Sequence, residues 1–348
     1  MKSDGRMGLL KHIGSIAWCA GVAVFIALIM WSGLGEIGSA VLSVGWGMLF
    51  VVLTRLATVS VAGAGWWVLF PKRGRPWLGL AIFLRFVREA VNTLFPLTQV
   101  GGDIVGARLL TFWAVPGALA AASVIIDVLM QAATLLLFAL LGLAILVAHG
   151  ADETIARIAA TGLGLAVLML SGFYVAQRKA GRRLLYSMLS RLKFDGSWRM
   201  LGTVDAVYQS LSMIYAQRFN IAASGQVHML GWLIGVAEVW IVFACMGHPV
   251  SVSDALVIES LTQAVRGGAF VIPSAIGAQE AGLILLCGLF GIPPDQALAL
   301  SLIKRAADVV VGLPGLVALQ ILESSRLAAG TYRNARARAS NDVQTESS

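Results

Sequence analysis

Charged residues, cysteines and the motifs of common catalytic sites are all scarce in this chain. Of its 348 residues, 13% are charged and 58% are hydrophobic, whereas a soluble domain carries about 25% charged residues. The three cysteines stand singly in apolar stretches and predict no disulfide framework. The four histidines are equally scattered, which argues against a zinc site. With a mean hydropathy of +0.83, these absences predict an all-α polytopic membrane protein.

Enzyme motifs are missing as well. The chain has no GxSxG with partner residues, no HExxH and no Walker A sequence. Ala107-Arg108 and Gly117 resemble part of a CDP-alcohol phosphotransferase motif, but Ala121 and Ile125 stand where that motif has carboxylates. We therefore expect no enzyme, no cofactor and no metal. The net charge of +8 is typical of basic loops that face anionic lipid, and we expect no nucleic-acid partner.

Six apolar segments are long enough to cross a bilayer. They are residues 13–32, 44–70, 116–147, 154–176, 226–247 and 293–323. The first follows basic residues as a signal peptide does, but its length favours a retained span. With the N-terminus in the cytoplasm, 18 of the 26 Lys and Arg residues lie on the cytoplasmic side and none lies in the opposite loops. This bias predicts that both termini are cytoplasmic.

Two further segments, 77–114 and 252–291, are apolar but carry charged centres interrupted by Pro and Gly. Each central proline has a charged residue seven positions before it and a carboxylate seven positions after it: Glu89 and Asp103 around Pro96, and Arg266 and Glu280 around Pro273. Non-helical backbone at membrane depth is tolerated only inside protein or beside a cavity. We interpret both segments as re-entrant helical hairpins; a pair of ordinary buried spans in each is the alternative.

The two prolines are 177 residues apart, so each half of the chain has the order span, span, hairpin, span. Because three spans are an odd number, the second half is predicted to be inverted relative to the first. The repeats are predicted at 1–150, with a hairpin that enters from the cytoplasm, and 151–323, with one that enters from the periplasm. The basic segment 177–225 is expected to be a helix on the inner leaflet or a solvated linker, and 324–348 a disordered tail.

Charged side chains inside the apolar segments are the main functional signal. Each costs at least about 2.5–3.5 kcal/mol at mid-bilayer, so they must pair or line a wet cavity. Helical spacing groups them on shared faces. The predicted substrate contacts are Arg85, Arg88, Glu89, Asn92, Gln99, Asp103, Arg108, Asp127, Glu259, Gln263, Arg266, Glu280, Arg305 and Asp308. The alternative is that these residues form ion pairs that hold broken helices together.

Roles follow from residue type and position. Arg88 and Arg266, beside the breaks, are best suited to an anionic headgroup, because guanidinium presents a planar fork of donors. Asp103 and Glu280 precede predicted helices, where they can cap the backbone, counter the arginines or carry a coupling proton, with capping favoured. The predicted hinge residues are Pro96, Gly101, Gly102, Pro273 and Gly277.

At these residues the chain resembles the lysylphosphatidylglycerol synthase transmembrane family, over roughly 10–325. The resemblance rests on Pro-x-x-x-Val-Gly-Gly-Asp at 96–103, Pro-x-x-x-Gly-x-x-Glu at 273–280 and Arg-x-x-Asp at 305–308. Gln279 stands where the family usually has Arg. The sequence FPLTQVGGDIVGARLL looks most like the hopanoid-associated HpnL branch.

The resemblance implies a lipid transporter or flippase of the bacterial cell inner membrane, whose substrate is a hopanoid or an anionic lipid. Together with the inverted repeats, it predicts alternating access through a charged central cavity. Lipid-biosynthetic enzymes are further expected partners. The competing expectations are a membrane scaffold that transports nothing and an integral-membrane lipid transferase.

Overall fold

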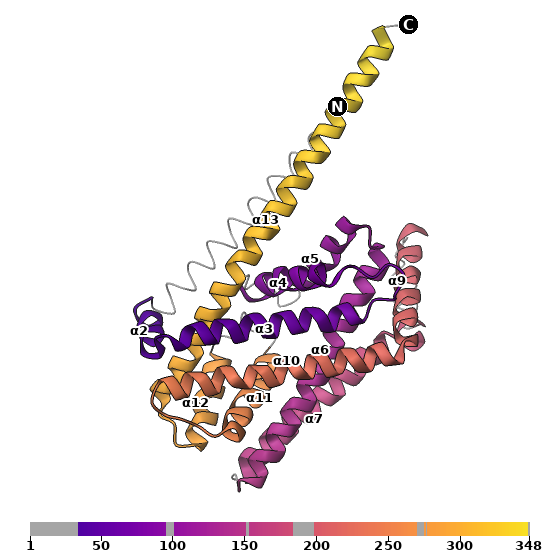
Figure 1. Ribbon diagram of the computed structural model, residues 1–348. Helices are drawn as coiled ribbons and strands as arrows, with labels where there is room; N and C mark the ends of the chain where they lie inside the picture. Colours follow the sequence, from indigo (N-terminus) through magenta and orange to yellow (C-terminus); the bar gives the residue numbers. More distant parts are fainter. Residues whose placement is uncertain are drawn as a thin grey trace.

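The protein is a bundle of helices, with no strand in the residues that the structure describes (Figure 1). The computed structural model describes residues 34–94, 101–150, 153–183, 198–269, 275 and 277–346. The helices are α2 (Leu34–Val44), α3 (Gly47–Val68), α4 (Leu78–Leu94), α5 (Gly101–Leu110), η1 (Thr111–Trp113), α6 (Gly117–Ala148), α7 (Glu153–Ala176), α9 (Trp198–Ala216), α10 (Arg218–Cys245), α11 (Val252–Gly268), α12 (Ala278–Leu289) and α13 (Pro294–Glu346). The predicted all-α membrane architecture is confirmed.

Five of these helices are long and apolar enough to cross a bilayer: α3, α6, most of α7, α10 and the Pro294–Arg326 part of α13. They agree in position with the predicted spans from 44 onward, while the predicted span 13–32 lies outside the described residues. Their outer faces are apolar. On α7, for example, Leu165, Leu168 and Met169 are 59–69% exposed, as suits contact with lipid chains.

Each of the two broken segments contains a pair of shorter helices. α4 packs against α5, and α11 packs against α12. With 10 and 12 residues, α5 and α12 rise about 15–18 Å, roughly half the thickness of the hydrocarbon core. Pro96 and Pro273, predicted as the breaks, lie outside the described residues, between the two helices of each pair.

Packing between helices repeats from one half to the other. With the 177-residue offset, α3, α4, α5 and α6 correspond to α10, α11, α12 and α13. α4 contacts α3, α5 and α13, while its counterpart α11 contacts α10, α12 and α6. Likewise α2 packs on α13 where α9 packs on α6. Each hairpin therefore lies between the spans of its own half and the last span of the other half.

The pair α3 and α10 forms the centre of this arrangement, and the two run side by side in Figure 1. They are antiparallel. A Cβ added at Gly47, the start of α3, would lie 2.5 Å from Sγ of Cys245 at the end of α10. At the other end, a Cβ at Gly65 would lie 2.9 Å from Nε2 of His228. Two glycines thus allow the close approach of corresponding helices.

Two apolar clusters flank the middle of the bundle. Val51 of α3 belongs to a cluster formed mainly by α10, α11, α12 and α13. Trp66, further along α3, belongs to a second cluster with α4, α5, α6 and α9. Between them, Arg55 and Thr58 of α3 face a polar cavity. The helices thus place a polar layer between two apolar ones.

The basic segment 177–225 contains α9, which packs against α6 and buries Leu211 and Ile214. The Tyr215 hydroxyl donates to Oε1 of Gln177 at 2.7 Å. Partial burial of that hydroxyl raises the pKa of Tyr215 to about 12. This part of the segment is therefore a packed helix that is hydrogen-bonded to the residue following α7. Residues 184–197 lie outside the described part.

The C-terminal segment differs from the sequence expectation. Residues 324–348 are predicted to be disordered, whereas α13 continues to Glu346 and projects away from the bundle (Figure 1). The apolar part of α13 ends near Arg326. Beyond it the sequence LAAGTYRNARARA is rich in Ala and Arg, which have high helix propensity. A prediction of disorder from polar composition does not take this propensity into account.

Candidate functional site

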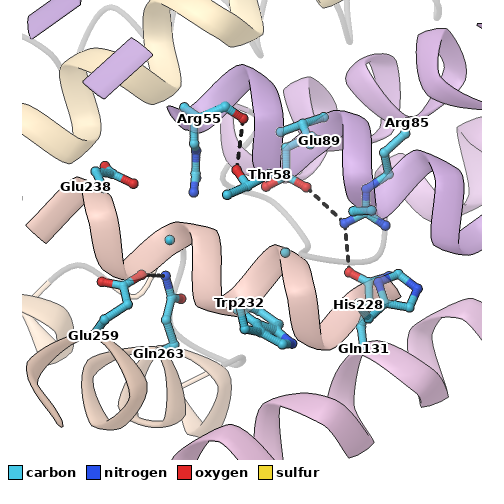
Figure 2. A pocket seen from close by; sticks show the side chains of 14 residues that line it. Arg55, Thr58, Arg85, Glu89, Gln131, His228, Trp232, Glu238, Glu259 and Gln263 are labelled. Atoms are coloured by element: carbon cyan, nitrogen blue, oxygen red, sulfur yellow. Dashed lines mark hydrogen bonds and ion pairs between the residues drawn. The ribbon is translucent and has the colours of Figure 1, made fainter. Parts of the chain in front are cut away.

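A polar cavity of about 90 Å³ lies in the middle of the bundle, between the two halves (Figure 2). Helices of both halves contribute to it: α3, α4 and α6 from the first, and α10 and α11 from the second. Its polar lining consists of Arg55, Thr58, Arg85, Glu89, Gln131, His228, Trp232, Glu238, Glu259 and Gln263. Figure 2 shows Arg85, Gln131 and His228 toward one end and Glu238 and Glu259 toward the other.

Asp127 of α6 is the centre of a charge network behind the first end of the cavity. Its side chain is fully buried. Nη1 of Arg85 lies 3.2 Å and Nη1 of Arg88 2.9 Å from its Oδ2. Nε2 of His228 lies 3.0 Å from its Oδ1, and Gln131 donates to Oδ2 at 2.9 Å. Two guanidinium groups and two hydrogen-bond donors thus compensate one buried carboxylate.

Arg88 also joins the two helices of the first hairpin. Its Nε and Nη2 donate to Oδ1 of Asp103 in α5 at 3.1 and 2.6 Å, and its guanidinium lies over the Trp66 ring, 4.5 Å from the centroid. Asn92 accepts from the N–H of Gly102 at 2.7 Å. Arg88 therefore forms ion pairs with two carboxylates and lies over an aromatic ring. Its guanidinium N–H groups point at protein side chains.

Lys304 of α13 is the centre of a second network. Its Nζ lies 2.8 Å from Oε2 of Glu259 and 3.5 Å from Oε2 of Glu238. Gln263 donates to Oε1 of Glu259 at 2.8 Å. The three charged side chains are between 2% and 6% exposed. One ammonium group thus serves two buried carboxylates from two helices of the second half.

Asp308 and Glu280 complete the charged interior. Asp308 pairs with Arg55 of α3 and, at 3.8 Å, with Nη2 of Arg266. Glu280 accepts from Arg305 at 2.6 Å and from the N–H of Gly277 at 2.7 Å. Gly277 is the N-cap of α12 and has φ +84°.

The predicted site residues fall into three groups. Arg85, Glu89, Glu259 and Gln263 line the cavity. Arg88, Asp103, Asp127, Arg266, Glu280, Arg305 and Asp308 belong to the ion pairs around it, and Asn92 holds the start of α5. Arg108 stands apart, because its side chain is 63% exposed and pairs with Glu323 at the surface. Gln99 lies outside the described residues.

The two predicted capping carboxylates behave differently. Glu280 caps α12 through Gly277, as predicted. The start of α5 is capped by Asn92 instead, and Asp103 pairs with Arg88. Gly101 and Gly102 begin α5, and a Cβ at Gly102 would overlap the carbonyl oxygen of Arg88. The sequence pattern is symmetric here, but the contacts are not.

Four central residues are absent from the predicted set: Arg55, His228, Glu238 and Lys304. The repeat offset provides a signal for one of them, because adding 177 to Asp127 gives Lys304. No comparable signal marks His228, an isolated histidine on an apolar helix that only the packing of α10 against α6 brings to Asp127. Within the described residues no group of three or more His, Cys, Asp or Glu side chains is placed to hold a metal ion.

Comparisons with known proteins agree with this architecture. The family described as Lysylphosphatidylglycerol synthase TM region matches residues 18–315. The UPF0104 membrane protein MJ1595 of Methanocaldococcus jannaschii is 21% identical over 245 residues, which cover 67% of this chain and 71% of that protein. No solved structure matches the chain.

Proposed function

We propose that this chain, which belongs to the family described as Lysylphosphatidylglycerol synthase TM region, is a lipid transporter or flippase. The observation that carries the proposal is the central cavity, which both halves line with charged side chains. A polar chamber at the centre of a membrane bundle provides a path for a lipid headgroup, while the apolar chains remain in the bilayer. The proposed location is the bacterial inner membrane, with both termini in the cytoplasm.

An anionic headgroup fits the arginines of the cavity. Arg55 and Arg85 both line it. The buried Nε of Arg85 has no hydrogen-bond partner among the described residues, and an unmade bond to a charged donor is costly. A phosphate oxygen would satisfy this donor. We therefore propose an anionic lipid, or a hopanoid linked to a polar group, as substrate.

Transport through this cavity requires a change of shape. Its volume of about 90 Å³ accommodates roughly three water molecules at liquid density, whereas ligand pockets usually occupy about 300–1,000 Å³. A headgroup therefore enters only when the halves separate. The antiparallel α3–α10 pair and the repeated packing of the hairpins support a rocking motion of inverted repeats.

Two other functions predict different behaviour. A scaffold for lipid-biosynthetic enzymes has no need of a charged cavity shared between repeats and would tolerate neutral substitutions in it. An integral-membrane lipid transferase would change the lipid chemically. We propose that the protein is not an enzyme and that membrane lipid is its principal partner.

Transport is tested with purified protein in liposomes that contain fluorescent phosphatidylglycerol, whose outer-leaflet fraction dithionite bleaches. We expect wild-type protein to expose the inner-leaflet lipid, and Arg85→Gln to slow this by roughly tenfold or more, since a charge-assisted hydrogen bond contributes about 1.5–3 kcal/mol. Arg157→Gln is the matched control, because that side chain is 71% exposed on α7.

Equal lipid movement in liposomes with wild-type protein and without protein would contradict the transporter proposal. Equal rates of lipid movement for wild type and a folded Arg85→Gln variant would show that the headgroup does not pass through the cavity. Mass spectrometry of lipids retained by the gently purified protein then identifies the substrate class. A hopanoid or one anionic lipid should be enriched in wild type and reduced in Arg85→Gln.

A further inference from the structure

The charges of the interior do not balance. Within the described residues, seven buried or half-buried carboxylates face six permanent cations. The carboxylates are Glu89, Asp103, Asp127, Glu238, Glu259, Glu280 and Asp308, and the cations are Arg55, Arg85, Arg88, Arg266, Lys304 and Arg305. An uncompensated charge in a membrane interior is expensive. The interior is therefore neutral only when it holds one extra proton.

The ion pairs locate the imbalance. Asp127 contacts two arginines and His228, and Asp308 contacts two arginines. In contrast, Glu238 and Glu259 share the single ammonium of Lys304. With both carboxyl groups ionised, this cluster has a net charge of −1. Two carboxylates that share one counterion in a buried site hold a proton between them.

Glu238 is the more weakly held of the two. Its side chain is 2% exposed, and within the described residues its one ion-pair partner is Lys304 at 3.5 Å. Glu259 has a shorter contact to Lys304 and a hydrogen bond from Gln263. Both carboxyl groups line the central cavity, and Figure 2 shows Glu238 without a bond to the other residues drawn. An under-compensated carboxylate therefore lies at the wall of the central cavity.

We infer that Glu238, Glu259 and Lys304 form a proton-binding site, which we name the acid pair with its lysine. A hydronium ion in the cavity transfers its proton to a carboxylate oxygen of Glu238 and leaves as water, and the reverse step releases the proton. No other reactant is needed. Use of this proton to drive lipid movement rests on the proposed function, whereas the binding of the proton does not.

Other charged groups reach the site from each neighbouring helix. α3 contributes Arg55 and α13 contributes Asp308, which pair with each other. α4 contributes Arg85 and Glu89, which face the same cavity and also pair. α6 contributes Asp127, which is compensated by Arg85, Arg88 and His228. Asp103 of α5 and Arg266 of α11 also belong to these networks, and Arg305 pairs with Glu280. Among the described residues outside the acid pair with its lysine, five carboxylates thus face five arginines, so the acid pair with its lysine carries the excess negative charge.

Proton occupancy would bias the two shapes of the transporter. When protonated, the acid pair with its lysine is neutral and compatible with the closed, nearly dry cavity. When deprotonated, its net charge favours hydration, and hence the open cavity in which water reaches Glu238. A ligand that binds two conformations unequally shifts their populations. A proton gradient is thereby linked to opening toward one side or the other.

Infrared spectroscopy of the purified full chain tests the proton directly, through the C=O band of a protonated carboxyl group at about pH 7. We expect wild type to show this band. Glu238→Gln and Glu259→Gln should each lose it, because the remaining carboxylate then has Lys304 to itself. Lys304→Met should roughly double the band, because both carboxyl groups then become protonated. Glu153→Gln, at a side chain 88% exposed, is the control and should match wild type.

Absence of the band in wild type would overturn the proposal and leave His228 as the proton carrier. A band that persists in both glutamine variants would also overturn it. If the glutamine variants do not fold, Lys304→Met decides the question, since an unchanged band there is incompatible with a shared ammonium. None of these results depends on lipid transport.

The coupling is tested separately in liposomes with an imposed pH gradient. Movement of fluorescent phosphatidylglycerol by wild type should respond to the gradient, and movement by Glu238→Gln should not. Transport without any response to the gradient would leave the proposed function intact and would refute the coupling.

Discussion

Asp127 and Lys304 stand 177 residues apart, at positions that the predicted repeat makes equivalent, and carry opposite charges. Each side chain is buried on the last span of its half, and each pairs with the longer helix of the broken segment in its own half, α4 or α11, and with α10. The two equivalent positions are thus both charged, with opposite signs. Consequently one half has an acidic centre with basic partners, and the other a basic centre with acidic partners.

Removing the charge of Asp127 should destabilise the protein strongly. In Asp127→Asn, Arg85 and Arg88 remain buried and lose their common carboxylate, a change that costs about 3–5 kcal/mol when one partner of a buried pair is removed. The free energy of unfolding in mixed detergent micelles measures this.

Glu153→Gln, in the exposed pair with Arg157 on α7, is the comparison and should change the free energy of unfolding by at most about 1 kcal/mol. If Asp127→Asn and Glu153→Gln both lower the free energy of unfolding by a similarly small amount, water already screens the network around Asp127.

At the scale of helices, the contact between α6 and α11 depends on one glycine. A Cβ at Gly142 of α6 would overlap Oγ of Ser260 in α11, which is fully buried. Overpacking of this kind costs about 1–3 kcal/mol. We expect Gly142→Ala to lower the free energy of unfolding by that amount. We also expect Ser260→Ala to recover about 1 kcal/mol or more of it in a double-mutant cycle.

Gly172→Ala provides the control for helix propensity. A Cβ at Gly172 of α7 meets no atom within 4 Å, so this substitution should stabilise the helix by roughly 0.5–1 kcal/mol. Additive effects of Gly142→Ala and Ser260→Ala would show that the two helices separate easily at this point.

The helices themselves were largely predictable from the sequence. Span-length apolar runs indicate α3, α6, α7, α10 and the first part of α13, because burial in lipid depends on local composition. The charge-bearing interruptions at Pro96 and Pro273 indicate the two broken segments. The C-terminal continuation of α13 was not predicted, because helix propensity and polarity point in opposite directions there.

At the scale of the whole molecule, the predicted orientation is tested by labelling single cysteines in intact cells with a membrane-impermeant maleimide. In a chain without Cys19, Cys245 and Cys287, a cysteine in place of Lys72 should be protected, because its loop is predicted to be cytoplasmic. A cysteine in place of His149, between α6 and α7, should react.

Permeabilised cells serve as the control, since both cysteines should react there if they are exposed. The reverse labelling pattern would contradict the orientation. Reaction at both sites in intact cells would contradict the parity of spans on which the inverted repeats depend.

The candidate site was predicted only in part, because its geometry depends on how distant helices pack against one another. Helical spacing identifies which side chains share a face, so the groups around Arg85 and Glu259 were found. Which faces meet depends on contacts between helices far apart in the chain, such as His228 with Asp127 at a separation of 101 residues. Arg55 and Glu238 enter the site by the same kind of contact, and no local pattern reveals it.

The two apolar clusters on either side of the cavity have an electrical consequence. If the cavity opens to one side at a time, as the proposed transport requires, water fills it from that side and the membrane potential falls mainly across the apolar cluster that remains closed. The field would then be concentrated over a short distance beside Glu238. A proton that crosses the whole potential gains about 2.3 kcal/mol per 100 mV, and here most of that energy would be delivered within the thickness of one cluster of packed side chains.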